Sequence, residues 1–273
     1  MNRRKKPVVY LLAAIGFTFL CVYVLFPFLW MVSVSFRYKV DIYDPANFAL
    51  FTLSNYEKII SEGILINFKN SAIVAVFSTI VSLLLGSLAA YGFARFTWKK
   101  RESRAFWVLS QRFLPPMAII VPYFMIAAFL KLLDTYLLLV ICYTSFNLPF
   151  TIWMMRGFIE DIPSELEEAA MVDGCTRGQT LMRIVLPLVL PGMVATAIFC
   201  IMNSWNEFVF ANFLTTIHAK TVPTTVMAYL TVAGVKWGEM AATGTLAVLP
   251  VLIFAISVQK YMIRGLTFGS VKG

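Results

Sequence analysis

The sequence predicts an all-α polytopic membrane protein with six transmembrane helices and cytoplasmic N- and C-termini. Hydrophobic residues make up 60% of the 273-residue chain and charged residues only 14%. A helix of about 20 mostly apolar residues crosses a hydrocarbon core of ~30 Å, and six segments of the chain are long enough to do so. In order, the predicted spans are residues 8–36, 71–93, 105–130, 132–155, 188–214 and 241–263.

Basic residues predict the orientation of these spans. Most of the 23 Lys and Arg residues fall in four regions that a six-span chain places on one side of the membrane, and the positive-inside rule makes that side cytoplasmic. The net charge of +9 therefore indicates a lipid environment and no nucleic-acid partner. The four basic groups are Arg3, Arg4, Lys5 and Lys6; Arg95, Lys99, Lys100, Arg101 and Arg104; Arg156, Arg177 and Arg183; and Lys260, Arg264 and Lys272.

No linker or repeat divides the chain, so we expect one transmembrane domain over residues 1–273. Its core covers about 66–260, after a first span and external segment at 1–65, and its cytoplasmic parts are a helix-turn-helix at about 160–187 and a tail at 264–273. The first span is longer than a signal-peptide core and is expected to be a retained anchor. The external segment is either a solvated loop or a surface that meets an external partner.

The loop between spans four and five carries an acidic cluster, with six of the 14 acidic residues between Glu160 and Asp173. Two S/T-x-x-E/Q patterns, which begin at Ser164 and Thr176, predict capping boxes at the starts of two short helices. Gly174 lies between them, where the first helix needs a left-handed exit. The second helix is expected to lead into span five through Pro187 and Pro191.

The first of these helices has a small-residue face suited to docking. Leu166, Ala169, Ala170 and Asp173 share one face at helical spacing, and acidic residues flank it. Such a helix fits a groove on another protein, but a solvated connector with acids near its N-terminus is an equally good interpretation of the residues alone. A DNA-reading helix is excluded because this helix has no Lys or Arg.

The same loop resembles a known motif. Glu168-Ala169-Ala170, then Gly174, then Ile184-x-Leu186-Pro187 has the spacing of the EAA signature in the membrane subunits of ATP-binding-cassette (ABC) importers. The resemblance implies the type I ABC importer permease fold and a coupling helix that sits in a cleft of a separate cytoplasmic ATPase. The docking residues implied in this chain are Glu165, Glu168, Ala169, Ala170, Asp173 and Gly174.

The C-terminal segment 237–273 is similar to the end of MalG-type permeases of carbohydrate importers, and segments 149–158 and 204–208 share this similarity. The resemblance implies import of a di- or oligosaccharide or a polyol across the bacterial cytoplasmic membrane. It implies a second, similar permease subunit, two ATPase subunits and an extracytoplasmic solute-binding protein as partners. It also implies that Gly265, Leu266, Thr267 and Lys272 form a tail that reaches the ATPases.

Polar residues inside apolar spans are costly, so they are candidates for the translocation path. Asn147 in span four and Asn203 and Glu207 in span five qualify, although Glu207 lies close enough to the outer interface to be merely interfacial. Arg112 in span three is expected to reach the headgroups or pair with a carboxylate. Pro115, Pro116 and Pro122 in that span predict a kinked helix.

Alternatives to a sugar permease are an ion-coupled secondary transporter, which needs a carboxylate near mid-membrane, and an ABC permease for another solute such as glycerol phosphate. An enzyme is not expected, because the chain has one histidine, His218, and no P-loop glycine pattern. We expect no catalytic residue, no metal site, no disulfide and no cofactor in this chain. ATP and Mg would then be bound by the partner ATPases.

Overall fold

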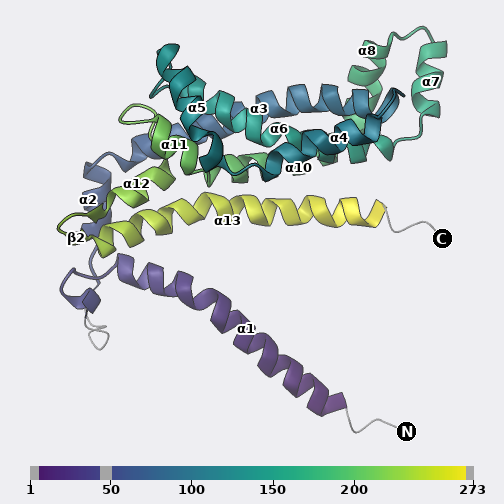
Figure 1. The fold of residues 1–273 in the computed structure, drawn as a ribbon. Coiled ribbons are helices and arrows are strands. Elements are labelled where there is room, and N and C mark those ends of the chain that lie inside the picture. Colours follow the sequence, from purple (N-terminus) through teal and green to yellow (C-terminus); the bar gives the residue numbers. More distant parts are fainter. Residues whose placement is uncertain (1–5, 44–50, 269–273) are drawn as a thin grey trace. The chain divides into compact units, whose positions relative to one another are not determined.

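The computed structural model describes the backbone of residues 6–43 and 51–268 and the side chains of residues 9–43 and 51–257. This part of the chain is almost entirely helical (Figure 1). It forms two compact units, Met1–Ile64 with Thr225–Leu249 and Leu65–Thr224 with Pro250–Gly273. The main helices are α1 (Lys6–Ser35), α2 (Ser54–Ser61), α3 (Ile64–Arg95), α4 (Arg101–Ser110), α5 (Pro116–Phe129), α6 (Tyr136–Glu160), α7 (Glu165–Val172), α10 (Leu190–Trp205), α11 (Val209–Leu214), α12 (Val222–Ala228) and α13 (Trp237–Phe268).

Four continuous helices in the described residues are long and apolar enough to cross a membrane: Val9–Ser35, Ile64–Arg95, Tyr136–Glu160 and Trp237–Ser257. Two further candidates are pairs of helices bent at a short break, Arg101–Phe113 with Pro116–Phe129 and Arg177–Leu188 with Leu190–Trp205. A multi-pass membrane protein follows from these helices. The count of six spans and the sidedness of the termini stay predictions.

The kink predicted in the span over 105–130 is confirmed, and it is a complete break, because the chain bends by 87° between α4 and α5. A short 3-10 turn, η2 (Gln111–Phe113), ends α4, and Pro115 is in an extended conformation with ψ 128°. Pro116 then begins α5 at a position where a missing N–H costs nothing. The prolines therefore break the helix at 114–115, whereas Pro122 lies inside α5.

The predicted single helix over 188–214 is wrong. Helix α9 (Leu186–Leu188) meets α10 at Val189 with a bend of 76°, so the helical segment before Val189 and α10 differ in direction. At its other end α10 stops at Trp205, and the separate helix α11 begins at Val209. The three residues between α10 and α11 include Glu207, whose side chain caps the start of α11, as described below.

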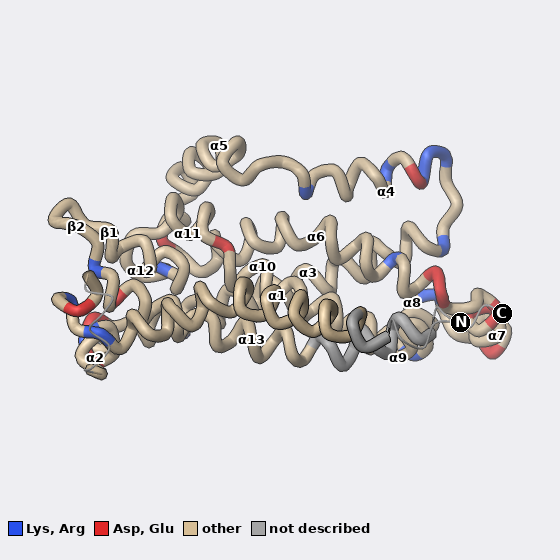
Figure 2. The backbone as a smooth tube through the Cα atoms, turned by 90° about the horizontal axis from the view of Figure 1, so that it is seen from below, with Lys and Arg blue, Asp and Glu red and all other residues tan. Residues whose placement is uncertain are grey.

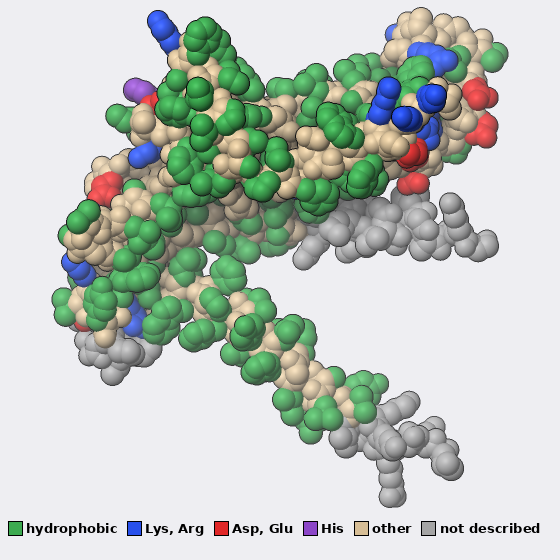
Figure 3. Space-filling model, in the orientation of Figure 1, with side chains coloured by type: hydrophobic (Ala, Val, Ile, Leu, Met, Phe, Trp, Pro, Cys, Tyr) green, Lys and Arg blue, Asp and Glu red, His purple; other side chains and the backbone are tan. Residues whose placement is uncertain are grey.

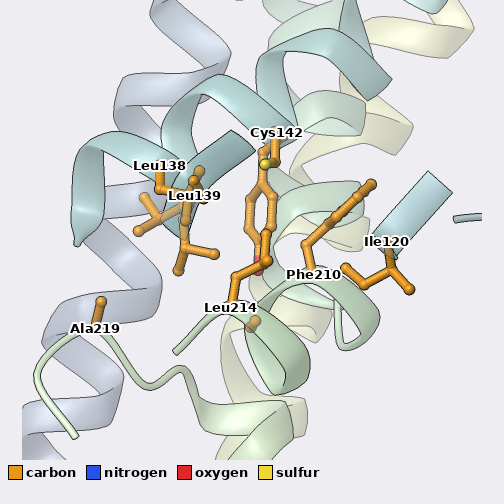
Figure 4. Close-up of a cluster of buried hydrophobic side chains, with 11 residues drawn as sticks. Ile120, Leu138, Leu139, Cys142, Phe210, Leu214 and Ala219 are labelled. Carbon is orange, nitrogen blue, oxygen red and sulfur yellow. The ribbon is translucent and has the colours of Figure 1, made fainter. Parts of the chain in front are cut away.

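The core of the second unit lies among α3, α5, α6 and α11. Tyr143 and Leu139 of α6 and Phe210 and Leu214 of α11 are at most 2% exposed, and Ile120 of α5 completes the cluster (Figure 4). Near the middle of α3 the helices approach closely, because an added Cβ on Gly86 would lie 2.5 Å from Cγ2 of Thr151 in α6. Glycine is therefore needed there for close helix packing.

Asp134 organises one end of the second unit. The turn between α5 and α6 contains Lys131 and Asp134 at positive φ, 55° and 60°. The Asp134 carboxylate accepts backbone hydrogen bonds from residues 216, 217, 218 and 219 at 3.0–3.1 Å. His218 is exposed and only its backbone takes part.

The first unit contains α1, α2, a small hairpin and the first part of α13. Asn55 of α2 donates from its amide to the carbonyl oxygens of Ser35 and Arg37, each at 2.9 Å, and so holds the end of α1. Lys58 of α2 pairs with Glu239, and the hydrogen bond to that carboxylate raises the pKa of Lys58. The strands β1 (Leu230–Thr231) and β2 (Gly234–Val235) form the hairpin.

Charged residues of the second unit concentrate at the ends of its helices (Figure 2). One end, where α4, α7 and α8 (Arg177–Thr180) lie, carries both acidic and basic side chains beside a largely hydrophobic surface (Figure 3). This distribution is expected of helices whose middle faces lipid and whose ends face water. The loop with the acidic cluster lies at this charged end.

Candidate functional site

The candidate site is the loop between α6 and α10, which folds as the predicted helix-turn-helix. Helix α7 is followed by a turn at Gly174, by α8, and by a π-helical segment, η3 (Leu181–Val185). Gly174 has φ +89°, a conformation that glycine adopts without strain. The Cys175 N–H donates to the Ala170 carbonyl at 3.0 Å and closes the turn, in the manner of a helix-ending Schellman motif. The predicted left-handed exit is confirmed.

Only one of the two predicted capping boxes is present. Oγ1 of Thr176 accepts from the Gln179 N–H at 3.3 Å, and Oε1 of Gln179 accepts from the Thr176 N–H at 2.8 Å, so the second box is confirmed. The first is wrong, since Ser164 is itself helical (φ −64°, ψ −23°) and its side chain makes no cap bond. A capping residue needs an extended backbone to turn its side chain toward the helix.

These caps give a testable pair of variants. Thr176→Ala is expected to destabilise the loop by about 1 kcal/mol, because it removes an N-cap hydrogen bond. Ser164→Ala is expected to leave the loop unchanged, because Ser164 caps nothing. Hydrogen exchange of the amides in residues 177–185 measures both: faster exchange in Thr176→Ala alone agrees with the structure, and equal effects would contradict it.

Glu167, which sequence analysis assigned to the first capping box, is instead buried against α3. Its Oε1 accepts from Nε of Arg95 at 2.6 Å, and its Oε2 accepts from the Tyr91 hydroxyl at 2.8 Å. Its side chain is 6% exposed. No local signal in the sequence indicates this contact, because Arg95 lies 72 positions earlier and reaches Glu167 only once α3, α6 and α7 have folded together.

Of the six predicted docking residues on α7 and its turn, four have exposed side chains, one is an exposed glycine and one is buried. Glu165, Glu168, Ala169 and Asp173 are exposed, as is the backbone of Gly174. Ala170 is 6% exposed and so lies on the inner face of α7, next to Glu167 along the helix. The predicted common face of Ala169 and Ala170 is therefore corrected: only Ala169 is available to a partner.

Asn147 and Asn203, two candidates for the translocation path, meet inside the helix bundle. Asn147 is 1% exposed, and its Nδ2 donates to Oγ of Ser204 at 2.8 Å, while Nδ2 of Asn203 lies 3.5 Å from Oδ1 of Asn147. Ser204 also bonds Ser78 of α3 at 3.0 Å. These contacts link α3, α6 and α10 in the way that polar side chains join helices in membranes.

Glu207, the third candidate, caps the start of α11. Its carboxylate oxygens accept from the backbone N–H groups of Phe210 at 3.0 Å and Ala211 at 3.3 Å. These are among the donors that the first turn of a helix leaves without a partner. The carboxylate is therefore engaged in helix capping, which sequence analysis missed because it treated 188–214 as one continuous helix.

Arg112 lies against aromatic rings of α6 and pairs with no described carboxylate, and its predicted contact with headgroups stays a prediction. Its guanidinium lies over the ring of Phe150, 4.7 Å from the centroid, and 5.8 Å from that of Phe146. A cation over an aromatic face is attracted by the ring quadrupole. Arg112 thus holds the break between α4 and α5 against α6, and the predicted carboxylate pairing is wrong for the described residues.

The predicted C-terminal contact residues lie largely outside the described side chains. Gly265, Leu266 and Thr267 fall within α13, whose helical backbone runs to Phe268, and Lys272 lies outside the described residues. In the described parts of the chain, no group of three or more His, Cys, Asp or Glu side chains is placed to hold a metal ion.

The long apolar helices define the class of the chain as a multi-pass membrane protein. Comparison with known proteins gives the family: residues 82–268 match the model of the binding-protein-dependent transport system inner membrane component. The chain belongs to this family of ABC transporter permeases, whose members are non-catalytic transport components.

Individual relatives are similar to this protein along nearly the whole chain. The probable ABC transporter permease protein y4oR of Sinorhizobium fredii is 39% identical over 91% of this chain and 90% of its own length. The trehalose/maltose transport system permease protein MalG of Thermococcus litoralis is 34% identical over 96% of this chain and 97% of its own. A solved bacterial ABC transporter involved in the import of the acidic polysaccharide alginate has the same fold, with a TM-score of 0.79 at 21% identity over 96% and 99% of the two chains.

Proposed function

We propose that this chain is one of two membrane subunits of an importer that moves a sugar into the cytoplasm. Two separate ATPase subunits, docked on α7, would drive the transport. The observation that carries the proposal is that α7 has a buried face and an exposed face. Glu167 and Ala170 are buried against the rest of the protein. Glu165, Glu168 and Ala169 are exposed. A short exposed helix on an anchored base is suited to docking in a groove.

The sugar class is supported by the trehalose/maltose permease among the relatives. The description of the family, binding-protein-dependent transport, supports an extracytoplasmic solute-binding protein as the supplier of substrate. The second permease subunit is proposed to be similar in sequence. We place the chain in a bacterial inner membrane with six spans and cytoplasmic termini, and ATP and Mg on the ATPases alone.

In this mechanism the chain converts movement of the ATPases into a change of the transport path. ATP-driven closure of the two ATPases draws the docked α7 helices of the two permease subunits together. The permease pair then changes from an inward-facing to an outward-facing state, which is a rigid-body transition between two packed arrangements. The exposed acids of α7 would pair with basic side chains around the ATPase groove, and the small side chain of Ala169 allows close approach.

An ion-coupled mechanism has less support. Such a transporter needs an intramembrane carboxylate that is able to exchange ions or protons, and the single candidate from the sequence, Glu207, caps α11. The proposed ABC mechanism needs no such group, because its energy comes from ATP on other subunits.

Purification of the complex from membranes of the native host tests the proposal. The tagged chain should be recovered with a second permease and an ATPase, and uptake into proteoliposomes should require MgATP. Calorimetric titration of the associated binding protein with disaccharides, oligosaccharides, polyols and glycerol 3-phosphate should give sugar binding in about the micromolar range. Recovery with no ATPase would contradict the importer mechanism, and binding of glycerol 3-phosphate alone would contradict the sugar.

A further inference from the structure

We propose that Arg95 and Glu167 form a mechanical link, so that α7 moves together with the ends of α3 and α6 when an ATPase displaces it. Both would be positioning residues, because they join α7 to α3 and their side chains are 15% and 6% exposed. The inference rests on the proposed function, since it concerns how the proposed docking helix acts on the rest of the chain.

The link joins three helices through one guanidinium group. Arg95 is the last residue of α3, and its Nε donates to Glu167 in the first turn of α7 at 2.6 Å. Its Nη2 donates to the carbonyl oxygens of Ile159 at 2.9 Å and Ile162 at 2.8 Å, at the end of α6. The C-terminal carbonyls of a helix carry partial negative charge and favour a cation.

Glu167 receives a second, independent bond from α3. The Tyr91 hydroxyl, one turn before Arg95, donates to the other carboxylate oxygen at 2.8 Å. Both oxygens of Glu167 are therefore held by α3, and the two bonds together fix the orientation of the carboxylate as well as its distance from α3. Two charge-assisted hydrogen bonds, one to each oxygen, restrict the carboxylate more than a single hydrogen bond does.

Burial makes the link tight. The side chains of Arg95 and Glu167 are 15% and 6% exposed, and Tyr91 is 8% exposed. Water therefore competes poorly for these charges, and separation of the pair would leave each buried ion without an opposite charge beside it, which is unfavourable. The two charges are consequently expected to stay together through movements of α7 that an exposed ion pair would not survive.

An apolar cluster continues the link into the bundle. Ala90 and Tyr91 of α3 pack with Met155 and Ile159 of α6, and with Leu181, Val185 and Val189 on the far side of the loop. Apolar packing is non-directional and tolerates sliding, whereas the Arg95–Glu167 pair fixes the register of α7 against α3. The polar pair therefore supplies the part of the attachment that transmits a displacement along the membrane plane.

Distances between spin labels on α7 and α3 test this directly. The labels are placed at the exposed positions Val172 and Leu84, in a chain whose four native cysteines are replaced, within the complete complex. In the otherwise unaltered chain we expect one narrow distance distribution, unchanged between the nucleotide-free state and the state trapped with MgATP and orthovanadate. In Glu167→Gln the narrow distribution should be lost, and the mean distance should shift on trapping.

A double variant separates a mechanical role from a purely stabilising one. Glu167→Gln leaves the charge of Arg95 buried with no carboxylate to compensate it, so it should lower thermal stability, and Arg95→Met/Glu167→Gln should recover much of that loss because no uncompensated buried charge remains. If the pair is a mechanical link, the double variant still gives a broad, nucleotide-dependent distribution. A narrow distribution in the double variant would overturn the proposal.

Asp161→Asn is the matched control, since Asp161 is an exposed acid close to the same loop, and it should behave as the unaltered chain. A change of the α7–α3 distance on trapping in the unaltered chain would also overturn the link. Failure of that chain to retain its ATPase is a separate result that contradicts the proposed function. The nucleotide-free comparison of the variants would still decide the link in that case.

Discussion

Gly86→Ala is expected to destabilise the second unit, whereas Gly92→Ala in the same helix is expected to stabilise it slightly. An added Cβ at Gly86 would lie 2.5 Å from Cγ2 and 2.9 Å from Cβ of Thr151, closer than van der Waals contact allows. Thr151 is fully buried, and its hydroxyl is bonded to the Asn147 carbonyl at 3.1 Å and to Sγ of Cys200 at 3.3 Å. It has no room to withdraw, so α3 and α6 must separate.

The size of this effect follows from two opposing contributions. Overpacking of a core costs about 1–3 kcal/mol, and replacement of a helical glycine by alanine gains about 1 kcal/mol. Gly92→Ala has only the gain, because no atom lies within 4 Å of the added Cβ. The free energies of unfolding of the two variants in detergent should differ by about 2 kcal/mol, and equal values would contradict the close packing of α3 on α6.

Asp134→Asn is expected to destabilise the end of the second unit by about 2 kcal/mol, because hydrogen bonds to a charged acceptor are among the stronger ones. Four backbone N–H groups and the Thr216 hydroxyl donate to this carboxylate. An amide has one acceptor oxygen in place of two, so several donors lose their partner. Hydrogen exchange of residues 216–219 should rise with the loss of stability.

The Asp134 contribution should depend on pH. Partial burial works against the charged form, but the four backbone donors outweigh it and hold the pKa of Asp134 well below its ordinary value of 3.8. A depressed folded pKa stabilises the protein above the unfolded pKa, and the contribution is lost as the pH falls through the folded value. The stability difference between the unaltered chain and Asp134→Asn should thus be constant above about pH 5 and shrink below about pH 4.

Asp161→Asn serves as the control for this measurement, because it removes an exposed acid and should change stability by less than about 0.5 kcal/mol. A stability difference for Asp134→Asn that stayed constant down to pH 2, or grew as the pH fell, would be inconsistent with the hydrogen bonds described.

Local signals in the sequence were sufficient for the parts of the loop that depend on neighbours along the chain. Gly174 and the Thr176–Gln179 box were predicted because a left-handed turn and a capping box each involve residues a few positions apart. The same reasoning failed at Ser164 and Glu167. There a residue from another helix, Arg95, takes the carboxylate that a local pattern assigned to a cap.

Breaks within apolar segments were harder to predict, because hydropathy is insensitive to the direction of a helix. The prolines indicated a kink in 105–130 but did not distinguish a break at Pro115 from one at Pro122. Glu207 was interpreted as a polar residue inside a span, because its role depends on α10 ending at Trp205. The assignment of Asn147 to the translocation path stays a prediction, and its hydrogen bond to Ser204 could not be predicted, because the two residues lie on different helices.

The central claim is that α7 is the docking helix of an ABC permease. It is tested most directly by measuring how much ATPase stays bound to the variant Ala169→Trp. Ala169 is exposed, so a bulky side chain there should leave the fold intact but prevent close approach of a partner. The tagged chain is purified with its partners, and the ATPase retained per permease is quantified, with Ser103→Trp at an exposed position of α4 as the control. The account predicts that Ala169→Trp loses most of its ATPase and Ser103→Trp keeps it, whereas equal retention by both variants would contradict it.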